Sequence, residues 1–137
     1  MQVSADRKCF VCGPENPIGL KTEFRINNKG NRAEATLSLS DHYQGWQGVV
    51  HGGIISALLD EAAIYACRSV SLHAVTTGLT VRFRKPVATG AVIVIQAEVD
   101  KIRRNLAIVN SVLMCGDEIM AEAEIKILLM DKSREGQ

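Results

Sequence analysis

Apolar and polar residues alternate along most of this chain, and one segment departs from the alternation. From residue 53 to residue 70, apolar side chains recur every three or four positions, which is the spacing of an amphipathic helix. In the other segments the apolar side chains fall on one face, as in strands with one buried side. This pattern predicts strands over residues 20–26, 32–39, 75–84, 91–103, 106–115 and 118–130.

Turn residues separate the predicted strands. The sequences Asn27-Asn28-Lys29-Gly30 and Gly116-Asp117 are typical of tight turns. The last four predicted strands are expected to follow one another as hairpins, which makes them antiparallel. One helix with roughly five or six antiparallel strands predicts an α+β fold in which long strands curl around the helix.

Length and composition narrow the class of protein. The 137 residues suit one domain with a sizeable core, flanked by an irregular arm (1–19) and a loose charged tail (131–137). The 16 Lys and Arg residues nearly balance 15 Asp and Glu, so no nucleic-acid partner is expected. No apolar run suits a membrane span or a signal peptide, which predicts a cytoplasmic protein without a membrane partner.

Two of the four cysteines form a Cys-x-x-Cys motif in the arm. Cys9 and Cys12 could be half of a zinc site or a redox pair, but Cys67 and Cys115 do not supply a second close pair. A turn is favoured instead, because Gly13-Pro14 follows directly. The histidines show no metal-binding spacing. No metal or other cofactor is therefore expected.

The predicted helix combines an apolar stripe with one unusual acidic residue. Asp60 lies on a face whose neighbours are small or apolar, whereas Glu61 lies on a flank that can reach water. A carboxylate on such a face is costly unless it has partners or a task. We expect a second subunit to cover this face, although an ordinary exposed acid would also fit. The stripe expected to pack on the sheet consists of Ile54, Ile55, Leu58, Leu59, Ala62, Tyr65 and Ala66.

The helix is preceded by the sequence His51-Gly52-Gly53. Backbone N–H groups at a helix start lack intrahelical partners, and the positive end of the helix dipole points there. Without side chains in the way, an anion or a polarised carbonyl oxygen can approach closely. An ordinary glycine-rich helix start capped by His51 is the alternative.

Distance along the helix predicts how these groups cooperate. Asp60 follows Gly52 by eight residues, which is about 12 Å along a helix. Both residues can therefore act on one carbonyl group only if they come from different chains. A two-fold dimer with antiparallel helices would form two such sites.

The motif His-Gly-Gly with an acid nine residues after the histidine resembles the hotdog-fold acyl-CoA thioesterases. The phenylacetate-pathway branch and the human thioesterase-superfamily members are the most similar. The segments CFVCGPENPIGLK (9–21) and VRFRKPVATG (81–90) share this resemblance. It implies a hotdog fold, in which a long antiparallel sheet wraps around one central helix. It also implies acyl-CoA as the substrate and a homodimer or a tetramer built from two dimers.

The resemblance also assigns roles to residues. Gly52 would polarise the thioester carbonyl through its N–H, with Gly53 and His51 beside it. Asp60 of the opposite subunit would act as general base or nucleophile. Thr77, or alternatively Thr76, would place the water. The family's Asn or Gln position falls on Gly45 here, so Gln44 or Gln47 would substitute.

Further residues are expected to hold the substrate. An apolar slot for the acyl group would include Trp46, Val49, Val50 and Ile64. Basic residues could meet the phosphates of coenzyme A, although solvated surface charge would explain them equally: Arg82, Arg84, Lys85, Arg103 and Arg104. A hotdog hydratase or dehydratase and a non-catalytic acyl-CoA-binding protein remain as alternatives, and the presence of Asp60 favours the thioesterase.

Overall fold

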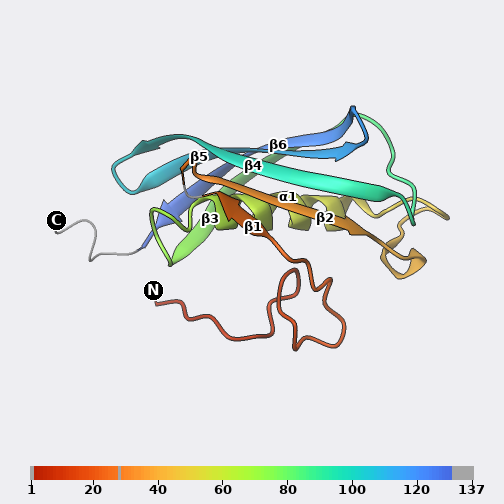
Figure 1. Cartoon of the computed structure of the whole chain (residues 1–137), viewed down its shortest axis with the longest axis horizontal. Helices are drawn as coiled ribbons and strands as arrows, with labels where there is room; N and C mark the ends of the chain where they lie inside the picture. The colour runs from red at the N-terminus through yellow and green to blue at the C-terminus, as the bar shows by residue number, and fades with distance from the viewer. Residues whose placement is uncertain (1, 28, 131–137) are drawn as a thin grey trace.

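The alternating segments form a single antiparallel sheet that packs against one helix (Figure 1). The structure is a computed structural model that describes residues 2–27 and 29–130. Within these residues the sheet has six strands, and the predicted α+β fold is confirmed. The elements are β1 (Arg25–Asn27), β2 (Arg32–Ser38), the 3-10 turn η1 (Asp41–Tyr43), α1 (Gly52–Ala66), β3 (Ala74–Phe83), β4 (Val92–Arg103), β5 (Leu106–Cys115) and β6 (Glu118–Leu129).

The strand order is β1-β2-β4-β5-β6-β3. The hairpins β4–β5 and β5–β6 are as predicted, but the expected hairpin between β3 and β4 is wrong. β3 pairs with β6 instead and forms an edge of the sheet. The segment 84–91 crosses the start of the helix, where the Val87 carbonyl accepts from Val50 N–H and Thr89 N–H donates to the Gly48 carbonyl. These bonds hold the connection away from β3, so it cannot fold back as a hairpin.

The first strand and the helix differ from their predicted bounds, and other strand ends differ from prediction by one residue. The first strand is confined to β1, because the N–H groups of Leu20 and Thr22 donate to the arm carbonyls of Phe10 and Val11 instead of pairing in the sheet. The helix starts at Gly52, because His51 is its N-cap. It ends at Ala66 instead of residue 70, and Cys67 closes its last turn.

The core lies between α1 and the sheet. Leu58, Leu59 and Ala62 are fully buried, in the same cluster as Ile95 and Ile125 of the strands. Burying a leucine side chain contributes roughly 1.5–3 kcal/mol. The predicted stripe is therefore confirmed at most positions, while two members remain partly exposed, Ile54 and Tyr65.

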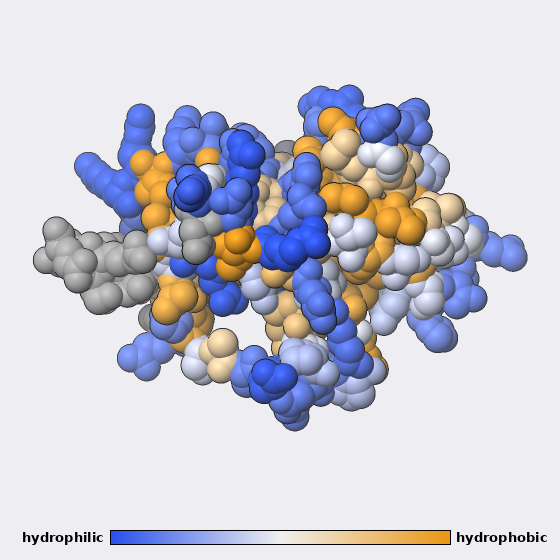
Figure 2. Space-filling model, viewed as in Figure 1, coloured by the Kyte–Doolittle hydropathy of each residue, from blue (hydrophilic) through white to orange (hydrophobic). Residues whose placement is uncertain are grey.

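The arm lies on the side of α1 that faces away from the sheet (Figure 1). Val11 enters the core and Phe24 stacks on Tyr65, with ring centroids 4.7 Å apart. The first part of the arm arches clear of the body, with polar side chains outward (Figure 2). The Glu61 flank, predicted to reach water, is covered by the arm, because the Cys9 thiol donates to the Glu61 carboxylate.

The predicted loose tail, 131–137, lies outside the described residues. No helix that the structure describes has the length and apolar character needed to cross a membrane.

Candidate active site

The start of α1 leaves one backbone donor free. His51 caps the helix, and its Nδ1 accepts from Gly53 N–H at 2.8 Å. The N–H groups of Ile54 and Ile55 donate to the His51 carbonyl. Gly52 N–H has no acceptor within residues 2–27 and 29–130. Because Nδ1 is an acceptor, a neutral His51 carries its proton on Nε2. The free Gly52 N–H therefore lies at the positive end of the helix dipole and can donate to a bound molecule.

Both glycines have a side-chain neighbour close to where a Cβ atom would lie. A Cβ atom at Gly52 would lie 3.3 Å from the Phe83 ring, and one at Gly53 would lie 3.1 Å from His51 Nδ1. Any side chain would also narrow the approach to the free N–H. The local packing therefore explains the sequence His-Gly-Gly, and Phe83 is a wall of the site that the sequence analysis did not identify.

A cavity of about 800 Å³ opens in front of the helix start. Trp46 and Val50, predicted for the acyl slot, both line it, whereas Ile64 does not. Trp46 is 86% exposed, so its ring stands at the mouth. The other lining residues are mostly apolar, with two cationic side chains among them: Gly45, Val49, His51, Gly52, Ile55, Phe83, Arg84, Lys85, Pro86 and Val87. An apolar cavity with one free backbone donor suits an acyl group attached to a polar carbonyl.

Asp60 lies on α1 beside the edge strand β3. Its Oδ1 accepts from the Thr76 hydroxyl at 2.5 Å, and its side chain is partly buried. Burial raises the pKa of Asp60 above its ordinary value, the Thr76 hydrogen bond lowers it, and the nearby Glu61 charge raises it. The outcome is a carboxylate that is more basic than a solvated aspartate.

The structure brings Thr76, and not Thr77, to this carboxylate. The Thr77 hydroxyl donates to the Lys126 carbonyl at 3.2 Å. A bulge between Thr76 and Gly78 shifts the pairing with β6 and sets which threonine faces the helix. The sequence shows two adjacent threonines but does not reveal the bulge.

Gly52 and Asp60 occupy the same continuous helix, so they lie about 12 Å apart along its axis. The spacing predicted from the sequence is therefore preserved. Beside Asp60, β3 ends the sheet and presents Leu79 and Phe83 as exposed large apolar residues. A long edge strand of this kind is a surface that a second chain can extend.

The glutamines lie in the loop before the helix. Gln44 Oε1 accepts from Gly48 N–H at 3.0 Å, which closes that loop. Gln47 is exposed and does not belong to the cavity lining. Neither glutamine belongs to the cavity lining, and the role predicted for them stays a prediction.

The basic residues divide into two groups. Arg84 and Lys85 line the cavity and form ion pairs with Glu122 and Glu118. The Arg84 hydrogen bond is the main reason that the pKa of Glu122 is lowered. Arg82 lies outside the cavity lining, opposite Glu122 in the β3–β6 register.

Arg103 and Arg104 stand at the far end of β4. The strand runs from Val92 to Arg103, a span of about 36 Å at the usual rise per residue. These two arginines therefore cannot reach the cavity of their own chain.

A second cluster lies on the flank of the helix next to Asp60. Cys9, Cys12 and Glu61 bring two sulfurs and a carboxylate oxygen within 4.8 Å of one another. The Cys-x-x-Cys motif indicated the first two residues, but no sequence signal indicated Glu61.

The comparisons with known proteins agree with this architecture. The model of the family described as Thioesterase superfamily matches residues 47–122, which include the helix start, Asp60 and Thr76. Acyl-coenzyme A thioesterase THEM4 of Xenopus laevis is 29% identical over 120 residues, covering 85% of this chain and 52% of the relative. The chain therefore spans about half the length of that curated relative.

Solved structures share the fold at low sequence identity. The protein smu.793 from Streptococcus mutans, solved bound to acetyl CoA, has a TM-score of 0.73 at 18% identity, covering 80% of this chain and 88% of its own. The PaaI protein of the E. coli phenylacetic acid degradation operon has a TM-score of 0.69 at 22% identity, covering 74% of each chain. The predicted hotdog fold is thus confirmed.

Proposed function

Since the chain belongs to the thioesterase superfamily, we propose that it hydrolyses the thioester bond of an acyl-CoA to a free acid and coenzyme A. The observation that carries this proposal is the free Gly52 N–H at the mouth of an apolar cavity. The acyl group occupies the cavity, and its carbonyl oxygen accepts from Gly52. The name of the Xenopus laevis relative and the acetyl CoA bound to the Streptococcus mutans protein support acyl-CoA as the substrate.

The Gly52 N–H stabilises the negative charge that develops on the carbonyl oxygen during the reaction. A preorganised donor aimed at the developing oxyanion typically lowers the barrier by about 3–4 kcal/mol. The helix dipole strengthens this donor, and His51 holds the neighbouring Gly53 N–H so that the helix start keeps its shape. Because a thiolate leaves readily, the remaining requirement is an attacking oxygen.

Asp60 provides or activates the attacking oxygen. It either takes a proton from the attacking water or attacks the carbonyl carbon itself. Thr76 fixes the orientation of the carboxylate through its hydrogen bond. Because about 12 Å of helix separates Asp60 from Gly52, the pair that acts on one substrate comes from two subunits.

A homodimer joined at β3 provides this arrangement. The edge strand and its exposed Leu79 and Phe83 support such a junction, because pairing would cover both the backbone and these side chains. Two copies related by a two-fold axis then share two equivalent sites, and further pairing of dimers gives a tetramer. Arg103 and Arg104, which cannot reach their own chain's cavity, become available to bind phosphate in another subunit.

Thiol release from a panel of acyl-CoA thioesters tests the proposal. Wild type is expected to hydrolyse at least one of the aliphatic or aryl substrates. Asp60→Asn should lose about 10²–10⁴-fold in kcat/KM, because the carboxylate is gone while its shape is kept. Gly52→Pro deletes the N–H at the first helical position, where proline is tolerated. This change should cost about 10²–10³-fold.

Two controls separate chemistry from folding. Gly52→Ala carries the same Cβ, 3.3 Å from Phe83, but keeps the N–H, so it should be far more active than Gly52→Pro. Asp60→Asn should melt no lower than wild type at neutral pH. The pKa of Asp60 is higher in the folded state than in the unfolded state. Ionisation of Asp60 therefore lowers the free energy of unfolding as pH rises above the pKa of the unfolded state. The asparagine amide does not ionise, so the variant avoids this loss.

The remaining outcomes identify the rival functions. Binding of acyl-CoA without thiol release from any substrate would indicate a non-catalytic acyl-CoA-binding protein. Hydration of an enoyl-CoA without thiol release would indicate a hydratase. Full activity of Asp60→Asn would remove Asp60 from the mechanism.

A further inference from the structure

The second cluster joins the arm to the helix outside the proposed active site. The Cys9 thiol donates to Glu61 Oε2 at 2.8 Å, across 52 positions of sequence. Cys12 lies beside it, and the two sulfurs and a carboxylate oxygen all lie within 4.8 Å of one another. All three residues are partly buried. The proposed hydrolysis uses none of them.

The turn that carries the two cysteines is built tightly. Gly13 N–H donates to the Cys9 carbonyl at 2.8 Å, and Cys12 N–H points to Cys9 Sγ at 3.5 Å. A Cβ at Gly13 would lie only 2.3 Å from Cys9 N, so the turn accepts no side chain there. The arm therefore presents both sulfurs from one rigid turn, with an N–H directed at the first of them.

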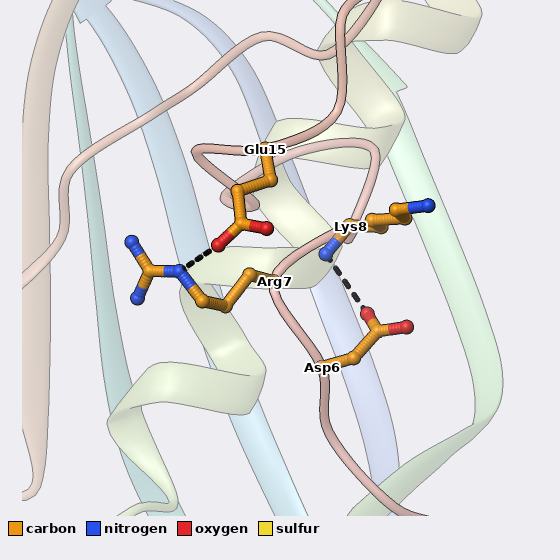
Figure 3. Close-up of polar contacts among 4 residues, drawn as sticks. All are labelled: Asp6, Arg7, Lys8 and Glu15. Carbon is orange, nitrogen blue, oxygen red and sulfur yellow. Dashed lines mark hydrogen bonds and ion pairs between the residues drawn. The ribbon is translucent and has the colours of Figure 1, made fainter.

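Hydrogen bonds within the arm hold the turn in shape. Leu20 N–H and Thr22 N–H donate to the carbonyls of Phe10 and Val11, the two residues between the cysteines. Figure 3 shows the outer contacts, where Arg7 pairs with Glu15 and Lys8 N–H donates to the Asp6 carboxylate. The ligand geometry is therefore set before any ion binds, which lowers the entropy cost of binding one.

A bound divalent ion would lie among three anionic ligands and near one cationic side chain. A thiol that coordinates a divalent cation is deprotonated outright, so the ligands would be two thiolates and one carboxylate. The Arg68 guanidinium, 4.5 Å from the Tyr65 ring centre on the same side of the helix, would offset the net negative charge of two thiolates and a carboxylate around the ion.

We propose that Cys9, Cys12 and Glu61 form a binding site for a zinc-class divalent ion that fastens the arm to α1. Two sulfurs and one carboxylate oxygen match the ligands that zinc takes, and water completes the tetrahedron. Binding transfers the two thiol protons to solvent as the two metal–sulfur bonds form. The site stands one residue from Asp60 along the helix, so the ion also fixes the surface next to the proposed catalytic carboxylate.

Cobalt absorption tests this site directly on the full chain. Reduced, metal-free wild type should bind about one Co²⁺, with a near-ultraviolet sulfur-to-cobalt band and tetrahedral visible bands. Zinc should displace the cobalt and raise the melting temperature. Cys9→Ser and Cys12→Ser should each weaken binding by more than about 10²-fold, beyond the effect of losing an outer-shell partner. Glu61→Gln should weaken binding while keeping the sulfur-to-cobalt band.

Cys115→Ser is the matched control, because it removes a partly buried thiol that is not in the cluster. It should bind cobalt as wild type does. Absence of a cobalt band that depends on Cys9 and Cys12, together with no stabilisation by zinc, would overturn the proposal. The cluster would then be a hydrogen-bonded contact alone. None of these readouts uses thioester hydrolysis, so failure here and failure of the proposed function are distinguishable.

Discussion

Asp60 combines two opposing influences on one carboxyl group. Burial and the Glu61 charge disfavour its ionised form, and the Thr76 hydroxyl favours it. A general base works best when its pKa is not far below the working pH. Burial and the Glu61 charge raise the pKa of Asp60 toward the working pH, while the Thr76 hydrogen bond stabilises the ionised form.

Removing the Thr76 hydroxyl should therefore change the pH profile of hydrolysis. The Thr76 hydrogen bond lowers the pKa of Asp60, so Thr76→Val should raise that pKa further. Activity needs the ionised carboxylate, so the acid limb of kcat/KM should move to higher pH. Rates measured across the acid range, on any acyl-CoA that wild type hydrolyses, would check this shift.

Thr77→Val is the matched control for that profile. It removes a hydroxyl that donates to the Lys126 carbonyl and leaves the Asp60 contact intact, so its acid limb should coincide with that of wild type. A shift in the Thr77 variant with none in the Thr76 variant would reverse the assignment of the two threonines.

The sequence could predict some of this site and not the rest. Asp60 was conspicuous because its helical neighbours carry no charge, and Gly52 because glycines are costly at an ordinary helix start. The choice between Thr76 and Thr77 depends on a bulge, which is a property of the pairing with β6. Glu61 was assigned to water because nothing in the helix pattern shows where a separate arm lies.

At the scale of elements, the start of α1 is where several segments meet. The connection after β3 crosses it, Phe83 stands against Gly52, and His51 caps it. The position of the Gly52 donor therefore depends on how well this helix start is formed.

The His51 cap can be tested by stability. His51→Ala removes the acceptor of the Gly53 N–H bond and should destabilise the fold by about 1 kcal/mol. The melting temperature should fall by about 4 °C for a domain of this size. Asparagine is a good N-cap that accepts from the same position, so His51→Asn should recover most of the loss. Equal melting of the alanine variant and wild type would show that the cap contributes nothing to stability.

Element boundaries separate what local pattern determines from what distant contacts determine. The β4–β5 and β5–β6 hairpins follow from alternation and turn residues that are adjacent in sequence. The pairing of β3 with β6, and the loss of residues 20–24 from the first strand, depend on the crossing connection and the arm. Both depend on bonds between residues far apart in the chain, which alternation does not encode.

At the scale of the whole molecule, one chain holds both halves of the proposed site without joining them. Gly52 faces the cavity at one end of α1, and Asp60 lies about 12 Å further along, next to the free edge of β3. In the proposed mechanism, the two groups that act on one substrate therefore come from two chains. This requirement makes subunit complementation a sharp test of the dimer.

Two inactive variants should restore activity when they share a dimer. Asp60→Asn keeps Gly52, and Gly52→Pro keeps Asp60. A heterodimer of the two contains one site with both native groups and one site with neither. Co-expression with different affinity tags, followed by sequential purification, should yield heterodimers with about half the wild-type rate of thiol release. Each homodimer alone should remain at least about 10²-fold below wild type. Pairing Asp60→Asn with the double variant Asp60→Asn/Gly52→Pro is the control, because no site then holds both groups. Heterodimers of the Asp60→Asn chain with the Gly52→Pro chain could instead be no more active than this control. The two groups would then not act across the subunit interface, and the two-chain site would have to be abandoned.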